Sequence, residues 1–357
     1  MSFTHPFKRH QRQVLSPEHR QILRGVSRSF DLTIQLLPTA LQAPVAVGYL
    51  LARATDTVAD TTGLPIAQRQ VLLNLMAQSI TAAKASHDQI RELSGLTQAF
   101  ASQQTDPQER ALMQALPQCL PLLHTLEQDD QRSVCQVLSH ITQGQQLDMT
   151  RFGPGLNALQ TQAELINYTW LVAGCVGEFW TELCGRHLPG YSLLPQEEMV
   201  QIGASYGMGL QRLNIIRDAG ADLRSGRCYW PVETLEKVGL TPDLMLETAQ
   251  TSHSKNLKAL DPLFTEWLDH TQAHLADGMR YALALKPLRL RLASALPALI
   301  GARTVALLRQ AGPEALNQRV KMPRQEVNTL LWRLALGLGS AAVLEREFQK
   351  LSREPQT

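Results

Sequence analysis

Two pairs of aspartates spaced four residues apart are the side chains in this sequence best suited to chemistry. The first pair is Asp56 and Asp60, within the segment 49–63. On a helix, residues i and i+4 share one face, with about 5–6 Å between their Cβ atoms, so the two carboxylates repel each other. Mg²⁺ would relieve the repulsion, because it takes carboxylate oxygens and completes its octahedron with water and phosphate oxygens. Taken alone, the pair fits a solvated acidic helix end equally well, since Gly63 and Pro65 follow it.

A second segment repeats this spacing at Asp218 and Asp222. Asn214 and Gln211 precede Asp218 by about one and two helical turns, so they lie on the same face of a helix. Carboxylate and amide oxygens on one face form a second candidate site for a hard cation.

Arginines accompany the second cluster. Arg217 adjoins it and Arg227 lies beyond it. A diphosphate could bridge cations held between two acidic faces, while arginines bind its outer oxygens through paired hydrogen bonds. The alternative is an ordinary ion pair of Asp218 with Arg217 or Arg224. Because the cluster occurs twice, the catalytic interpretation is favoured.

Helices must position these side chains, and the sequence has the matching pattern. Apolar residues recur at three- and four-residue spacing, while the alternation typical of strands is nearly absent. Proline and glycine interrupt the pattern near 38–44, 61–65, 105–107, 153–155, 189–195, 226–231, 287 and 312–313. This predicts about a dozen helices of roughly 10–25 residues. We expect one all-α helical-bundle domain over residues 1–357, with its core at about 20–345.

Composition excludes several other classes of protein. The net charge of +2, with scattered basic residues, argues against nucleic-acid binding. The odd number of cysteines, five without a C-x-x-C pair, predicts reduced thiols and a cytoplasmic protein. No apolar stretch follows the basic start, so we expect no signal peptide. We also expect no membrane span, since the nearest candidate, 330–344, contains Arg333.

Five segments between about residues 27 and 326 resemble, in order, the motifs of the squalene/phytoene synthase family, closest to its squalene synthase branch. They are Ser27–Phe30, Tyr49–Asp60, Tyr168–Gly177, Gln211–Asp218 with Arg227–Pro231, and the weaker Val320–Arg324. The resemblance implies an all-α isoprenoid synthase bundle, with the aspartate clusters on opposite walls of a central apolar cavity.

The same resemblance implies roles for individual residues. The implied catalytic residues are Tyr168, Tyr49, Asp56, Asp60, Asp218 and Asp222, the tyrosines handling protons and steering carbocations. The implied Mg²⁺ ligands are Asp56, Asp60, Asn214, Asp218 and Asp222. The implied diphosphate contacts are Arg28, Arg53, Arg217, Arg227, Gln211 and Asn214. The implied NADPH contacts are Arg28, Arg53, Arg217, Lys321 and Arg324.

The implied reaction joins two farnesyl diphosphates head to head through presqualene diphosphate, and NADPH then reduces the product to squalene. Alternatives are a dehydrosqualene or phytoene synthase, or an enzyme that stops at presqualene diphosphate. A catalytically inactive helical assembly factor is also open, because Ala59 and Ala221 replace glutamates common in squalene synthases. The four surviving aspartates argue against inactivity. An apolar product predicts transient contact with a membrane surface, and the oligomeric state is left open.

Overall fold

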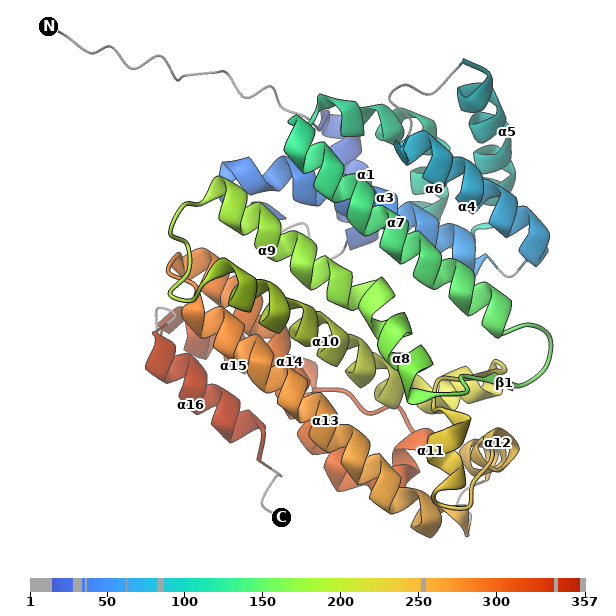
Figure 1. The fold of residues 1–357 in the computed structure, drawn as a ribbon, viewed down its shortest axis with the longest axis vertical. Helices are drawn as coiled ribbons and strands as arrows, with labels where there is room; N and C mark the ends of the chain where they lie inside the picture. The colour runs from blue at the N-terminus through green and yellow to red at the C-terminus, as the bar shows by residue number, and fades with distance from the viewer. Residues whose placement is uncertain are drawn as a thin grey trace, which may run out of the picture. The chain divides into compact units, whose positions relative to one another are not determined.

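The computed structural model describes residues 15–27, 34–35, 37–61, 63–81, 87–251, 255–336 and 340–353. These residues are overwhelmingly helical, which confirms the all-α prediction (Figure 1). The exception is a parallel pair of two-residue strands, β1 (Asn157–Ala158) and β2 (Arg227–Cys228). The chain divides into two compact units, residues 1–138 and 139–357. Organisation as one domain therefore stays a prediction.

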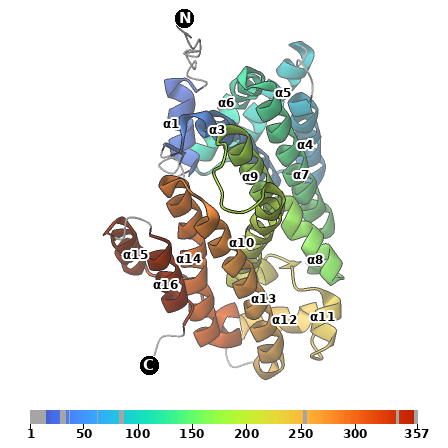
Figure 2. The same cartoon turned by 60° about the vertical axis from the view of Figure 1, so that its left-hand side comes forward.

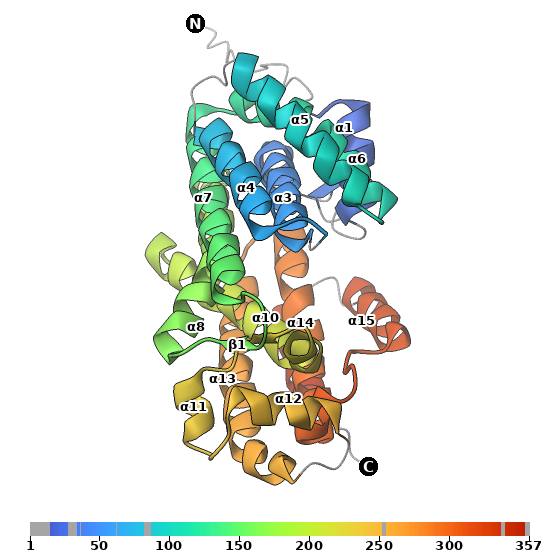
Figure 3. The same ribbon diagram turned by 90° about the vertical axis from the view of Figure 1, so that its right-hand side faces the viewer.

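The first unit is built from helices that surround α3. Its elements are α1 (Pro17–Ser27), α3 (Thr39–Asp60), α4 (Ile66–Thr81), α5 (His87–Gln103), α6 (Pro107–Cys119), the 3-10 helix η1 (Leu120–Thr125) and the start of α7 (Gln128–Arg151). Helix α3 packs against α4 and α6 (Figure 3). Its apolar face is buried at Leu51, Ala54 and Val58, and this burial fixes the direction of the acidic pair on the same helix.

The predicted break at 38–44 is wrong in part, because α3 begins at Thr39 and continues through Pro44. Proline at that position removes one backbone hydrogen bond near the start of the helix. The loss is local, and the buried apolar face that follows stabilises the remaining turns.

The second unit is organised around the 29-residue helix α10. Its other helical elements are the end of α7, α8 (Gln162–Thr169), the π-helical segment η2 (Trp170–Gly174), α9 (Cys175–His187), α10 (Gln196–Arg224), α11 (Val232–Glu236), α12 (Pro242–Gln250), α13 (Asn256–Ala284), α14 (Leu288–Ala311), η3 (Gly312–Leu316), α15 (Arg324–Leu336) and α16 (Ala341–Leu351). Helices α9 and α13 both pack along α10, and α14 packs on α13 (Figures 1 and 2). The described residues form fifteen α-helices (α1 and α3 to α16), more than the dozen expected, partly because short helices form after Pro231 and at Pro242.

Helices α9 and α10 approach unusually closely where two glycines meet. A Cβ atom added to Gly177 would lie 2.0 Å from the carbonyl oxygen of Gly203, a distance that no side chain can occupy. The close approach fixes α10, which carries the second aspartate pair, against the helix that follows Tyr168.

Aromatic stacking anchors the chain after β2. Trp230 is 1% exposed and stacks on Trp267 of α13, with ring centroids 4.1 Å apart and an interplanar angle of 8°. The pairing of Asn157 with Arg227 fixes the other end of the segment. Arg227 and Tyr229 are therefore held in place from both sides.

Among the described residues, Leu288–Leu316 is long and apolar enough to span a membrane. The segment includes charged residues such as Arg303, so the expectation of no membrane span is not contradicted, but the choice of 330–344 as the nearest candidate is wrong. In its apolar stretch of 18 residues, 56% of the residues are buried inside the protein, and α14 packs on α13. Burial of this kind is typical of a core helix.

Candidate active site

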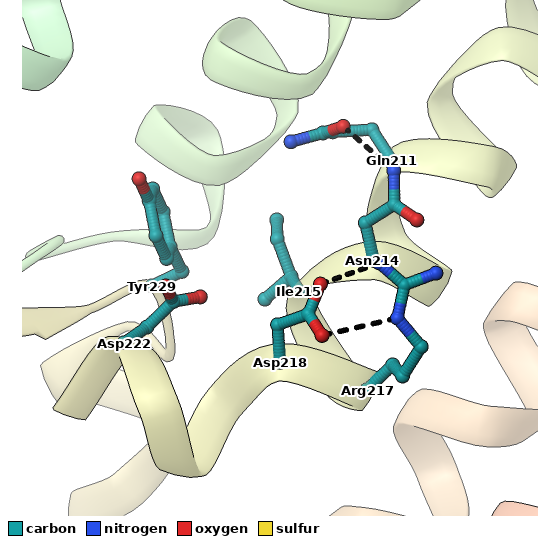
Figure 4. A pocket seen from close by; sticks show the side chains of 7 residues that line it. All are labelled: Gln211, Asn214, Ile215, Arg217, Asp218, Asp222 and Tyr229. Carbon is teal, nitrogen blue, oxygen red and sulfur yellow. Dashed lines mark hydrogen bonds and ion pairs between the residues drawn. The ribbon is translucent and has the colours of Figure 1, made fainter. Parts of the chain in front are cut away.

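A pocket of about 210 Å³ lies along one face of α10 in the second unit (Figure 4). It is lined by Gln211, Asn214, Ile215, Arg217, Asp218, Asp222 and Tyr229. The structure therefore confirms that the amides and carboxylates selected from the sequence share one helical face, while their roles stay predictions. Polar side chains reach this pocket because Leu213, Ile216 and Ala219, on the other faces of the helix, are buried in the core.

Asp218 forms a two-point ion pair with the neighbouring arginine. Arg217 donates from Nε to Oδ1 at 3.1 Å and from Nη2 to Oδ2 at 2.5 Å (Figure 4). The ordinary ion pair considered as an alternative thus exists, although Arg224 instead donates to the carbonyl oxygen of Ala249. The pair does not displace Asp218 from the pocket, and it brings a guanidinium to the pocket wall. A fixed positive charge beside an acidic cluster suits the binding of a phosphate-bearing ligand.

The carboxyl group of Asp222 has a strongly perturbed pKa. Burial, followed by the negative charge of Asp218, raises this pKa from 3.8 to about 7, while Arg227 and Arg217 oppose the shift. A cation between the two carboxylates would remove their repulsion.

The donor set fits Mg²⁺. Asp218 and Asp222 offer carboxylate oxygens and Asn214 offers an amide oxygen, the hard ligands that Mg²⁺ prefers. Within the described residues, no three His, Cys, Asp or Glu side chains are grouped as a metal site. Water and phosphate oxygens are common further ligands of Mg²⁺ at phosphate-transfer sites.

The raised pKa of Asp222 predicts a pH-dependent effect of the Asp222→Asn substitution on stability. The folded protein binds this proton more tightly than the unfolded chain does, so the stabilisation is complete below pH 3.8 and is lost as the pH rises through 7. Asparagine mimics the protonated side chain. We expect the variant, without metal, to melt about 2 °C above the wild type at pH 8, with a smaller difference at pH 5.

Thermal unfolding in chelator-containing buffer measures the two differences. Glu197→Gln, on the exposed first turn of the same helix, is the matched control. A difference that does not change with pH, or a variant less stable than the wild type at pH 8, would contradict the assignment.

Tyr229 and Arg227 both donate hydrogen bonds to a carboxylate outside the two aspartate pairs. Tyr229 donates its hydroxyl hydrogen to Oδ1 of Asp148 at 2.5 Å, and Arg227 donates to Oδ2 of Asp148 at 3.4 Å. Asp148 lies near the end of α7, within the second unit. Sequence analysis missed Asp148, because it belongs to no acidic repeat and only the fold brings it to Tyr229.

Tyr168 joins this network through its ring. The side chain is 7% exposed and stacks on Tyr229, with ring centroids 5.1 Å apart and an interplanar angle of 26°. Burial, followed by the charge of Asp148, raises the pKa of Tyr168 above its ordinary value, so this hydroxyl is neutral near pH 7. A π-helical segment, a feature frequent at functional sites, begins two residues after Tyr168.

The first aspartate pair lies in the first unit. Asp60 is the exposed last residue of α3, and the half-buried Asp56 accepts an ion pair from Arg53. Arg53 also pairs with Glu109 of α6, a partner that the sequence did not reveal. Burial, followed by the charge of Asp60, raises the pKa of Asp56 to about 6 against the opposing effect of Arg53. Both aspartate pairs thus contain one carboxyl with a raised pKa.

The other selected residues are accounted for as follows. Tyr49 donates to the carbonyl oxygen of Val26 at 3.3 Å. Lys321 and Arg324 are exposed, just before and at the start of α15. Arg28 lies outside the described residues. Because the two aspartate pairs belong to different units, their convergence on one chamber stays a prediction.

Comparison with known proteins supports the family resemblance found in the sequence. The family model for squalene/phytoene synthases matches residues 23–326. A squalene synthase from Cyberlindnera jadinii is 26% identical over 93% of this chain and 70% of its own length. A 15-cis-phytoene synthase from a Synechocystis species is 26% identical over 74% of this chain and 68% of its own length. The chain spans 42% to 70% of the length of eight curated relatives that it matches.

Solved structures support the fold. The complex of TcSQS with the ligand E5700 aligns with a TM-score of 0.69 at 20% identity, over 93% of this chain and 88% of that one. At this identity the likeness bears on architecture alone, and it confirms the expected all-α isoprenoid synthase fold.

Proposed function

Because the chain belongs to the squalene/phytoene synthase family, we propose that it is a squalene synthase, which joins two farnesyl diphosphates head to head and reduces the product. The observation that carries the proposal is the α10 pocket. There, two carboxylates, two amides and an arginine line a single surface. Such a surface suits a ligand that carries a diphosphate together with a cation.

In the proposed first step, the allylic carbon–oxygen bond of one farnesyl diphosphate ionises. Arg217, at the pocket wall, would stabilise the charge that develops on the leaving diphosphate. Arg227 lies on β2 and interacts with Asp222, so it would add positive charge nearby. Mg²⁺, when bound by Asp218, Asp222 and Asn214, supplies Lewis-acid stabilisation of the same charge.

In the proposed second step, the allylic cation is attacked by the double bond of the second farnesyl diphosphate. Aromatic faces stabilise positive charge, and the stacked rings of Tyr168 and Tyr229 provide such faces in the second unit. Loss of a proton then closes the cyclopropane of presqualene diphosphate. Water must be excluded, because it would trap the cation as an alcohol.

The reduction is the finer part of the proposal. Lys321 and Arg324 are two exposed cations on either side of Pro323, and their charges fit a phosphate group. NADPH, when bound, supplies the hydride that quenches the final cation. Arg53 and Arg217 are already engaged in ion pairs, so they would have to exchange partners to contact the cofactor.

Product identification tests the proposed function. We expect purified protein, given farnesyl diphosphate and Mg²⁺, to yield presqualene diphosphate without NADPH and squalene with it, as measured by mass spectrometry. Dehydrosqualene formed regardless of NADPH would instead support the runner-up, a dehydrosqualene or phytoene synthase, which the phytoene synthase relative favours. Failure to consume farnesyl diphosphate would favour the inactive assembly factor.

We also place the protein in the cytoplasm, with transient contact at a membrane surface where the apolar product leaves. Trp332 and Leu331 on α15 are 72% and 44% exposed, and Lys321 and Arg324 are exposed near the same helix. Aromatic and basic side chains together favour the interface of an anionic bilayer. Lack of flotation with anionic liposomes would remove this part of the proposal.

A further inference from the structure

Asp148 of α7 is a half-buried carboxylate that the steps of the proposed function leave without a role. Its two oxygens have different partners: Tyr229 donates to Oδ1 at 2.5 Å, and Arg227 donates to Oδ2 at 3.4 Å. Both partners belong to the segment that follows α10, and Tyr229 lines the α10 pocket. The carboxylate therefore connects α7 to the pocket wall through two side chains.

Packing against two other rings holds Tyr229 in place. Its side chain is 7% exposed and stacks on Tyr168, and the ring of Phe152 meets it at an interplanar angle of 63° with centroids 4.8 Å apart. The Tyr229 hydroxyl therefore has a fixed position, and its hydrogen bond to Oδ1 fixes the rotation of the Asp148 carboxyl group. As a result, Oδ2 is directed at Arg227.

Arg227 lies within electrostatic reach of two carboxylates. Its backbone pairs with that of Asn157, and its guanidinium pairs with Asp148. Burial, followed by the charge of Asp218, raises the pKa of Asp222, and the charge of Arg227 opposes this shift. A guanidinium has five N–H donors, so Arg227 can donate to Asp148 and still bind an anion beside Asp222. A long side chain loses rotamer freedom when it binds a ligand, and a partner that orders it beforehand reduces that loss.

We propose that Asp148 is a positioning residue, which holds Arg227 in the orientation that binds the diphosphate group of the substrate. This inference rests on the proposed function, which supplies the diphosphate. Like charges repel, so by its charge alone the Asp148 carboxylate weakens the binding of a diphosphate nearby. The ordering of Arg227 outweighs this repulsion. The two effects have opposite signs, and a binding measurement therefore separates them.

The test measures the binding of inorganic diphosphate in the presence of Mg²⁺ by isothermal titration calorimetry, so it needs no turnover. Asp148→Asn keeps the shape of the side chain and an oxygen that accepts from Tyr229, but it loses the charge that pairs with Arg227. We expect the Kd of this variant to rise about tenfold, near the lower end of what a hydrogen bond to a charged group contributes. A Kd equal to that of the wild type or below it would overturn the inference.

A double-mutant cycle with Arg227→Gln shows whether Asp148 acts through Arg227. When Arg227 is already replaced, no guanidinium remains to be positioned, so adding Asp148→Asn should change the Kd less than about twofold. If Asp148 only stabilised the surrounding structure, the same substitution would weaken binding by an equal factor in both backgrounds. Equal factors would therefore overturn the inference.

Glu164→Gln is the matched control. Glu164 of α8 forms an ion pair with Arg151, the last residue of α7, and does not line the α10 pocket. Its substitution also removes a carboxylate that pairs with an arginine near the end of α7, and it should leave the Kd for diphosphate unchanged. Melting temperatures of all variants check folding.

Tyr229→Phe decides if Asp148→Asn does not fold. It keeps the packed ring and releases the Asp148 carboxyl group, so it should raise the Kd when Arg227 is present and change it less than about twofold in Arg227→Gln. An equal increase in both backgrounds would overturn the inference. If the wild type does not bind diphosphate with Mg²⁺, the proposed function fails and the inference with it, whereas a failed cycle in a wild type that binds overturns the inference alone.

Discussion

Asp218→Asn is expected to lower the rate of diphosphate release from farnesyl diphosphate about 10³-fold, a loss comparable to removing a key electrostatic group from an active site. The substitution keeps the size of the side chain and removes one negative charge from the α10 pocket. It thereby removes a hard ligand for Mg²⁺ and the acceptor of the two-point pair with Arg217. Steady-state release of diphosphate at saturating substrate measures the effect.

A magnesium titration shows whether the rate falls because a metal ligand is lost or because the partner of Arg217 is lost. If Asp218 binds the metal, the variant should need a much higher Mg²⁺ concentration, and part of its activity should return there. Glu197→Gln, an exposed substitution on the same helix, should behave as the wild type does in both respects. Near-normal rates in Asp218→Asn at ordinary Mg²⁺ concentrations, with helicity unchanged by circular dichroism, would exclude the metal role.

Local rules were sufficient to predict the arrangement along α10. Residues 211, 214, 218 and 222 follow the helical period, and the apolar residues between them predict which face is buried. The structure accordingly places all four in one pocket. The fold class was equally accessible, since nearly every segment has helical periodicity, although prolines such as Pro44 and Pro262 lie inside helices and do not mark breaks.

Contacts between distant segments could not be predicted in this way. Asp148 and Tyr229 are 81 residues apart, and Arg53 and Glu109 are 56 apart. Neither acidic partner belongs to a motif, so no spacing along the chain points to it. Their positions follow from packing: the parallel pairing of β1 with β2 holds Arg227 and Tyr229, and α3 packs against α6.

The raised pKa values of the carboxyl groups could not be predicted from the sequence either. Sequence spacing predicts that carboxylates four residues apart repel each other, but the size of the effect depends on burial. Asp222 and Asp56 have pKa values raised to about 7 and about 6, with burial as the largest cause in both. Burial is a property of the folded chain, so a perturbed carboxyl in each pair became visible only in the structure. A perturbed pKa of this kind is a frequent mark of a functional site.

Asp56→Asn carries the other large prediction, because it tests whether the first unit contributes to the same reaction. Arg53 pairs with both Asp56 and Glu109, so Asp56→Asn and Glu109→Gln each remove one ion pair from the same guanidinium. Ion pairs this exposed contribute about 0–1 kcal/mol to the stability of the folded protein. If Asp56 and Glu109 serve only as partners of Arg53, the two substitutions should therefore have similar, small effects.

As a metal ligand, Asp56 has a role that Glu109 lacks. We therefore expect Asp56→Asn to lower the rate of diphosphate release about 10³-fold, the loss expected for Asp218→Asn, and Glu109→Gln to lower it less than about tenfold. The same steady-state assay measures both, with melting temperatures as the check on folding. Equal, small losses in the two variants would make Asp56 an ion-pair partner of Arg53, and the four carboxylates would then not act on a common diphosphate.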